Sequence, residues 1–322
     1  MKVNIRFCTF KDPAHADCAF PRNMANSNDT HPCILVTGSR GQLGQSIFKL
    51  RHEFSDFRFL FTDRSSLDLT SEPDILAFLS GHPSIRFCIN CAAYTAVDKA
   101  EQEAEAAWKA NAAGPGYLAA ACADSAIPLI HLSSDYVYHN DNNVPLRETD
   151  ATQPKGIYAQ TKLQGEQLVR QHHPDGTLIV RTSWVYAPWG HNFVRTMLRI
   201  AQERPAVSVV CDQVGTPTYA PDLAMALLRI LRDLRQGTRD ISALAGIYNF
   251  SNEGVASWYD VAAAVFRMKG IDTTVRPIPT VEFPTPAQRP PYSILDKSKF
   301  KSVFGQVIPH WQDSLAQCLR QL

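Results

Sequence analysis

The sequence has little of what marks membrane, secreted and nucleic-acid-binding proteins. Its 322 residues contain no apolar run near the roughly 18 residues that span a bilayer. The formal net charge is only +1, with 32 basic against 31 acidic side chains, so no long-range field attracts nucleic acid or an anionic membrane. We therefore expect neither as a partner, and any selectivity for an anion must come from a local cluster of residues.

Disulfide and metal patterns are also missing. The eight cysteines are scattered, and the one close pair, Cys88 and Cys91, ends an apolar stretch without a second pair. This arrangement favours ordinary buried thiols over a zinc or redox site. The ten histidines show no ligand spacing, so no metal site is predicted. Reduced thiols are typical of a cytoplasmic protein.

Composition and patterning divide the chain into three parts. Residues 1–31 are mixed polar and charged, unlike a signal peptide, and we expect them to form a flexible leader. We predict a dinucleotide-binding domain over 32–183 and a smaller substrate-binding lobe over 184–322, partly interwoven with the first. At 45% hydrophobic residues the chain can bury a full core.

Apolar strands alternate with helices through the first of these domains. Strands are expected at 33–37, 57–61, 86–91, 128–134 and 177–182, and helices at 42–52, 72–80, 99–124 (interrupted near 114–116) and 158–172. This rhythm predicts an α/β fold, a Rossmann-type doubly wound parallel sheet that binds ligands at the carboxyl ends of its strands. Beyond residue 183 we expect strands at 207–210 and 246–250, helices near 191–203, 221–235 and 256–268, and a proline-rich loop over 277–291.

Three glycines follow the first strand at the spacing of a dinucleotide-binding turn. Gly38, Gly41 and Gly44 allow a tight turn, close approach to a pyrophosphate and close packing of a helix on a strand. The amides that open the next helix, at Gln42 and Leu43, would face the phosphates. The strand–turn–helix setting makes this motif much more specific than glycine spacing alone.

Residues after the second strand give conflicting signals about the choice of cofactor. Asp63 lies about 20 positions beyond the turn, where a carboxylate accepts a ribose hydroxyl, and this favours NADH. Arg40 and Arg64 are either ligands for the 2′-phosphate of NADPH or ordinary solvated arginines. We expect NADPH to be used with NADH tolerated, and Asp68 and Leu69 to hold the adenine.

A tyrosine and a lysine four residues apart, Tyr158 and Lys162, share one face of a predicted helix. An ammonium near a phenol lowers the phenol pKa from about 10 toward neutrality, which makes tyrosine a usable acid. The strand at 128–134 ends in two hydroxyls, Ser133 and Ser134. The Tyr/Lys pair alone would be typical of any surface helix. A dinucleotide turn, a strand-end hydroxyl and this pair, in that order, predict a carbonyl reductase.

Longer motifs resemble the extended short-chain dehydrogenase/reductase family from residue 33 nearly to the C-terminus. They are residues 90–101 (NCAAYTAVDKAE), 133–138 (SSDYVY), 158–162 (YAQTK), 181–186 (RTSWVY) and 212–218 (DQVGTPT). The last two are similar to the dTDP-4-dehydrorhamnose reductase branch of that family. The resemblance implies NADPH-dependent reduction of the C4 ketone of dTDP-4-dehydro-L-rhamnose, a sugar-nucleotide precursor of cell-surface polysaccharide.

The same resemblance implies roles for individual residues. Tyr158 would donate the proton, Lys162 would lower the Tyr158 pKa and bind the nicotinamide ribose, and Ser134 would hold the carbonyl oxygen. Ser134 stands where the family more often has threonine, and it keeps the hydroxyl. Further cofactor contacts are implied at Ala92, Ala93, Tyr94, Asn111 and Ser133, and substrate contacts at Val97, Asp135, Tyr136, Trp184 and Arg289, the last facing the diphosphate.

Several alternatives stay open at this point. Trp184 is also explained as a core aromatic, Asp135 as a loop cap and Asn111 as a structural residue. Some relatives bind magnesium through glutamates at a dimer interface, but those glutamates do not map onto this chain, so a homodimer and a magnesium requirement are both left open. The competing functions are a non-catalytic NADP-binding subunit resembling the methionine adenosyltransferase β-subunit, and a sugar-nucleotide epimerase or dehydratase.

Overall fold

The computed structural model describes residues 31–139 and 143–322. Residues His31–Leu322 group as one compact unit. The expected leader over 1–31 lies outside the described residues, apart from His31. No helix in the described part of the chain is both long and apolar enough to cross a membrane. The six cysteines within these residues are all free thiols.

A parallel sheet forms the centre of the described chain and confirms the predicted fold class. Its six strands run in the order β10-β5-β4-β3-β1-β2, and every neighbouring pair is parallel. They are β1 (Cys33–Thr37), β2 (Arg58–Phe61), β3 (Ile85–Asn90), β4 (Leu129–Ser134), β5 (Thr177–Thr182) and β10 (Gly246–Asn249). Strand order reverses between β1 and β3, the kind of switch point where doubly wound folds bind ligands. Because β10 lies beyond residue 183, both predicted domains supply strands to this sheet. The predicted domain boundary between residues 183 and 184 therefore stays a proposal.

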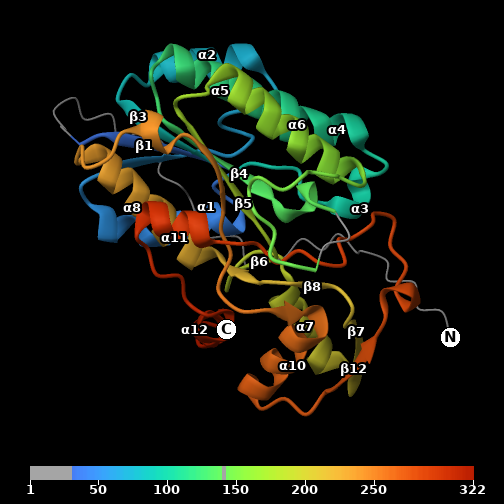
Figure 1. The fold of residues 1–322 in the computed structure, drawn as a ribbon. Helices are drawn as coiled ribbons and strands as arrows, with labels where there is room; N and C mark the ends of the chain where they lie inside the picture. Colours follow the sequence, from blue (N-terminus) through green and yellow to red (C-terminus); the bar gives the residue numbers. More distant parts are fainter. Residues whose placement is uncertain (1–30, 140–142) are drawn as a thin grey trace. The chain divides into compact units, whose positions relative to one another are not determined.

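Helices cover both faces of the sheet (Figure 1). One face carries α1 (Gln42–Leu50), α8 (Ala220–Arg235) and α11 (Ser298–Phe304), and the other carries α2 (Glu72–Gly81), α5 (Gly114–Asp124) and α6 (Ile157–His172). Alternate residues of β1 serve the two faces, because side chains of a strand point to opposite sides. Ile34 and Val36 join the core under α1 and α8, whereas Cys33 and Leu35 join the core under α2 and α5.

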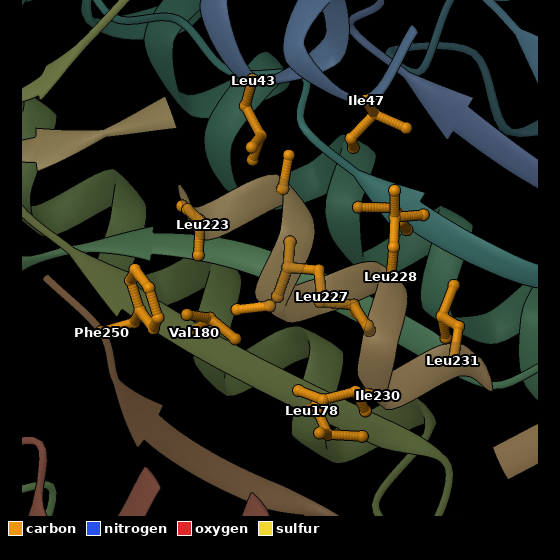
Figure 2. Packing of buried hydrophobic residues seen from close by; sticks show 14 of the residues in the cluster. Leu43, Ile47, Leu178, Val180, Leu223, Leu227, Leu228, Ile230, Leu231 and Phe250 are labelled. Atoms are coloured by element: carbon orange, nitrogen blue, oxygen red, sulfur yellow. The ribbon is translucent and has the colours of Figure 1, made fainter. Parts of the chain in front are cut away.

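The core between α8 and the sheet is shown in Figure 2. Leu223 and Leu227 of α8 are fully buried among side chains from α1 and β5, including Ile47 and Val180. An apolar stripe repeats along α8 at helical spacing, which is why this C-terminal helix packs on the N-terminal sheet. The packing fixes α8 against α1, the helix that follows the glycine turn.

The helix predicted at 99–124 differs from the expectation. It is broken at 101–103 into α3 (Val97–Ala100) and α4 (Ala104–Trp108), then runs through a π-helical turn, η3 (Lys109–Ala113), directly into α5. The interruption predicted near 114–116 lies next to this π-helical turn, which ends at Ala113, and the chain stays helical through Gly114. A Cβ on Gly114 would lie 2.7 Å from the Leu69 carbonyl oxygen, so this glycine permits close packing. Pro115, which has no N–H, sits in the first turn of α5, where it is tolerated.

The remaining elements pack beyond the carboxyl end of β5. Three short strand pairs join β6 (Val185–Tyr186) to β9 (Thr218–Tyr219), β7 (Ala206–Val210) to β12 (Thr274–Ile278), and β8 (Val214–Gly215) to β11 (Ala256–Ser257). Helices α7 (Phe193–Glu203), α10 (Trp258–Lys269) and α12 (Trp311–Leu319) share a separate apolar core with them. The shorter helices are η2 (Arg51–Phe54), η4 (Asp135–Val137), α9 (Ile241–Leu244) and η5 (Thr280–Glu282). The loop predicted at 277–291 was wrong at its start, since Pro277 lies in β12, an edge strand that tolerates proline.

Leu227→Ala tests the core between α8 and the sheet. Removing a fully buried leucine leaves a cavity, and we expect the free energy of unfolding to fall by about 2–5 kcal/mol. Urea unfolding followed by circular dichroism measures it. Leu76 on α2 is 45% exposed, so Leu76→Ala should stay within about 1 kcal/mol of the parent protein. Equal losses in the two variants would contradict the packing described for α8.

Candidate active site

The turn between β1 and α1 has the geometry of a phosphate-binding loop. Gly38 has a φ of +64°, and a Cβ there would lie 2.6 Å from the Ala92 backbone nitrogen. A Cβ on Gly44 would lie 2.6 Å from the Gly38 carbonyl oxygen. Gly41 occupies the N-cap of α1 and has no side chain, so the first amides of the helix are open to an anion. The turn therefore fits a dinucleotide pyrophosphate.

Asp63 lies just beyond β2 and is already well supplied with hydrogen-bond donors. Its carboxylate accepts hydrogen bonds from the Ser65 amide at 2.9 Å and hydroxyl at 2.6 Å, and pairs with Arg40 at 2.5 Å. The Ser65 hydroxyl and, less strongly, the Arg40 guanidinium hold the Asp63 pKa below its usual range. Arg64 instead approaches Asp68 at 3.7 Å. Arg40 thus neutralises the Asp63 carboxylate, which would otherwise repel the 2′-phosphate of NADPH.

The loop after β3 is held by a side chain from the π-helical turn. Asn111 is fully buried, and its Oδ1 accepts from the Tyr94 amide at 2.8 Å while its Nδ2 donates to the Tyr94 carbonyl at 3.1 Å. The same Nδ2 donates to the Thr161 hydroxyl of α6 at 3.3 Å. Asn111 therefore acts as a bridge that positions the Ala92–Tyr94 loop and does not line the cleft itself.

Tyr158 stands one turn before Lys162 on α6, opposite the end of β4. Ser134 donates to Asp135 at 3.0 Å and accepts from the Tyr136 amide at 3.2 Å. Burial raises the pKa of Tyr158 to about 12, and a hydrogen bond with Ser134 opposes the rise. Lys162 is 2% exposed, and its Nζ donates to the Leu132 carbonyl at 2.7 Å.

The expected lowering of the Tyr158 pKa by Lys162 was wrong for this arrangement. Burial is the main cause of the raised Tyr158 pKa, the Asp135 charge raises the pKa further, and the group that lowers it is the Ser134 hydroxyl. The Lys162 ammonium is directed to Leu132, and burial lowers its own pKa to about 8, with Glu166 acting in the opposite direction. The phenol consequently keeps its proton at neutral pH.

Glu166, one further turn along α6, is a site residue that the sequence reasoning missed. It forms a buried ion pair with Arg181 of β5, at 2.9 Å to Nε and 2.6 Å to Nη2, and also accepts a hydrogen bond from Ser133. Arg181 donates in turn to the Tyr138 hydroxyl at 2.6 Å. An arginine inside the apolar strand TLIVRT was the available signal, since a buried charge requires a partner.

The predicted substrate residues are divided between the cleft and its rim. The Tyr136 ring meets the Tyr158 ring edge-on at 5.4 Å, and Trp184 stacks on Trp258 at 3.7 Å. Asp135 is buried beneath them, and this burial raises its pKa to about 7. Arg289 was predicted to face a diphosphate, but Asp98 binds its guanidinium at 2.6 and 2.7 Å.

A continuous cleft of about 1610 Å³ joins these parts. It passes from the glycine turn, along the Ala92–Tyr94 loop, to the aromatic side chains around Tyr158. Predicted residues that line it are Gly38, Arg40, Gly41, Gln42, Leu43, Asp63, Arg64, Asp68, Leu69, Ala92, Ala93, Tyr94, Val97, Ser133, Ser134, Asp135, Tyr136, Tyr158, Lys162 and Trp184. Gly44, Asn111 and Arg289 lie outside this lining, whereas Trp258 and His191 line it and were not predicted.

Metal ligands do not gather in the described part of the chain. Residues 31–139 and 143–322 contain no group of three or more histidine, cysteine, aspartate or glutamate side chains placed to hold a metal ion. Around Tyr158 and the glycine turn, the cleft presents hydroxyl, ammonium and backbone amide groups. This chemistry suits an organic cofactor and a carbonyl substrate.

Known proteins share both the sequence and the fold. The model of the RmlD substrate binding domain matches residues 32–322. The dTDP-4-dehydrorhamnose reductase of Escherichia coli is 41% identical over 90% of this chain and 97% of its own. A crystal structure of the Clostridium acetobutylicum enzyme of that name has a TM-score of 0.82 at 37% identity, over 89% of this chain and 98% of its own. The Bacillus anthracis enzyme, solved in complex with NADP, has a TM-score of 0.82 at 33% identity, over 91% of this chain and 100% of its own. With the glycine turn and the Ser134, Tyr158 and Lys162 side chains in one cleft, the chain belongs to the dTDP-4-dehydrorhamnose reductase family.

Proposed function

We propose that the protein reduces the C4 ketone of dTDP-4-dehydro-L-rhamnose to dTDP-L-rhamnose with NADPH, in the cytoplasm. The observation that carries this proposal is the cleft that places Ser134, Tyr158 and Lys162 at one end and the glycine turn at the other. The names of the relatives support the sugar nucleotide, and the NADP complex of the Bacillus anthracis enzyme supports the cofactor.

The cofactor fits the residues that are present. The space that Gly38 and Gly44 leave free suits a pyrophosphate at the N-terminus of α1. Ala92 and Ala93 would border the nicotinamide half, and Lys162 would hold its ribose. When bound, the reduced nicotinamide supplies the hydride that converts the ketone carbon into an alcohol carbon.

Tyr158 is suited to deliver the proton in this direction of reaction. Because its pKa is about 12, the phenol is protonated at neutral pH, and the alkoxide that forms on reduction is a stronger base than phenolate. Ser134 would hydrogen-bond the same oxygen and orient it toward the phenol.

The sugar end of the cleft is assigned to Val97, Asp135, Tyr136 and Trp184. All four line the cleft beside Tyr158. A contact between Arg289 and the diphosphate is not assigned, because the guanidinium would have to exchange its bidentate partner Asp98 for the ligand. We therefore assign no residue to the nucleotide diphosphate.

Substrate-dependent oxidation of NADPH tests the proposed reaction. Purified protein, NADPH and dTDP-4-dehydrorhamnose should give one dTDP-rhamnose for each NADPH consumed, with NADH as a slower second cofactor. Binding of NADPH without turnover would support a regulatory subunit instead. Product formation without net NADPH consumption, from a cofactor that co-purifies with the protein, would support an epimerase or dehydratase.

Tyr158→Phe tests the acid. The ring and its packing against Tyr136 remain while the proton is lost, so we expect turnover to fall by about 10²–10⁴-fold with little change in NADPH affinity. Steady-state kinetics and a fluorescence titration of NADPH measure the two quantities. Tyr117→Phe on α5, where the half-buried ring packs against the core and does not line the cleft, should keep normal turnover. Near-normal turnover by Tyr158→Phe would remove this residue from the mechanism.

Arg40→Ala tests the choice of cofactor. Its guanidinium both attracts a 2′-phosphate and neutralises Asp63 at 2.5 Å, so we expect a preference for NADPH of about tenfold in the parent, equivalent to about 1.4 kcal/mol. The variant should lose that preference while its kcat/KM with NADH is retained. Arg64→Ala is the matched control, because Arg64 approaches Asp68 instead and should matter less. An unchanged preference for NADPH over NADH in Arg40→Ala would show that this arginine points to solvent and does not contact the cofactor.

A further inference from the structure

Residues 212–218 (DQVGTPT) form a motif to which the proposed chemistry gives no role. The structure places them against the chain that follows β5. The Thr218 amide donates to the Trp184 carbonyl at 3.2 Å, and the Ser183 hydroxyl donates to the Thr216 carbonyl at 2.7 Å. The motif therefore fixes the backbone of residues 183 and 184 by hydrogen bonds, and Trp184 is part of the cleft lining.

Trp184 has a backbone conformation that needs such support. Its φ is +48°, in the left-handed region that side-chain-bearing residues rarely adopt. A residue in this region persists where the surrounding contacts determine it, and such residues cluster at ligand-binding sites. The strained backbone directs the half-buried indole into the lining of the cleft.

Trp258 covers the Trp184 ring. Their ring centroids are 3.7 Å apart with planes inclined by only 12°, and Phe193 packs on Trp258 at 4.8 Å. Trp258 is the first residue of α10, and a reciprocal capping box between Ser257 and Asp260 fixes that end of the helix. Both indoles line the cleft.

Gly215 of β8 supplies the second contact with the indole. A Cβ on this residue would lie 2.9 Å from Cε2 and Cζ2 of Trp184 and 2.7 Å from the Ser293 hydroxyl. These distances are shorter than those that real Cβ atoms show. The Trp184 ring is stacked on Trp258 and cannot move away freely. Gly215 does not have a left-handed φ, so the need for glycine here is the room that it leaves for the indole.

We propose that Gly215 and Trp258 are positioning residues that hold Trp184 against the hexose ring of the substrate, and so set how the sugar is presented to Tyr158. The inference rests on the proposed role of Trp184 in sugar binding. A flat, rigid indole pair suits the apolar face of a 6-deoxyhexose, because an aromatic wall gives large contact area at low conformational cost. Gly38 and Asp63 line another part of the cleft, and a hydrogen bond from the Gln42 side chain to the Val185 carbonyl at 3.1 Å, next to Trp184, links the two parts.

Gly215→Ala is the direct test. The added methyl group should displace the indole and raise the KM for the sugar nucleotide about tenfold or more, with a smaller fall in kcat. The Kd of NADPH should stay within about twofold of the parent, which separates a shifted wall from a misfolded protein. Gly81→Ala is the matched control, because a Cβ there meets nothing within 4 Å in the described chain apart from its chain neighbours and the backbone of its own helix. An unchanged KM in Gly215→Ala would overturn the proposal.

Trp258 variants give a second test. Trp258→Leu removes the stacked partner and should raise the same KM, whereas Trp258→Phe keeps an aromatic face and should restore most of the parental value. Parental KM values in Trp258→Leu would overturn the proposal as it concerns this residue.

Circular dichroism provides a readout that does not depend on turnover. Two nearly parallel indoles in contact couple their transitions and give an exciton couplet, which Trp258→Leu should abolish and Gly215→Ala should weaken. A Gly215→Ala couplet equal to that of the parent would show that the glycine does not position Trp184. If the parent protein failed to reduce the sugar nucleotide, the proposed function would fall, and the couplet would still decide whether Gly215 positions the indole.

Discussion

The buried ion pair between Glu166 and Arg181 is the contact on which the arrangement of the site depends. Their side chains are 2% and 3% exposed, and the pair joins α6 to β5 while Ser133 joins the same carboxylate to β4. Removing one partner of such a pair leaves an uncompensated buried charge and typically costs about 3–5 kcal/mol. Lys162 and Tyr158 lie about one and two turns from Glu166 on α6, so the ion pair helps to fix where both meet the cleft.

Close backbone approach reinforces this position of α6. A Cβ on Gly165 would lie 2.0 Å from the Asn111 carbonyl oxygen, so the helix contacts the π-helical turn directly. The Asn111 side chain reaches from that turn to the Ala92–Tyr94 loop and to Thr161. The proposed catalytic helix and the proposed nicotinamide wall are thus parts of one packed unit, in which a proton donor and a cofactor can be held at constant separation.

Much of this organisation could be predicted from the sequence because the relevant signals are local. The glycine turn, the hydroxyls that end β4 and the Tyr158/Lys162 spacing each lie within a few residues, and the structure places them in one cleft. Contacts between distant segments could not be predicted. Asp98 binds Arg289 from 191 positions away. Trp258 stacks on Trp184 from the first turn of a helix that was predicted from the sequence without any role in the site. The predicted lowering of the Tyr158 pKa was wrong for the same reason, because the burial that raises this pKa depends on the whole fold.

Transfer of deuterium from NADPH labelled at the reactive position of the nicotinamide tests the central claim most directly. The protein would be incubated with labelled NADPH and dTDP-4-dehydrorhamnose, and the product analysed by NMR and mass spectrometry. With the label on the transferred hydrogen, we expect dTDP-rhamnose with one deuterium, located at C4, and one oxidised cofactor for each product molecule. Product without deuterium at C4 from both the 4R- and the 4S-deuterated cofactor would contradict it.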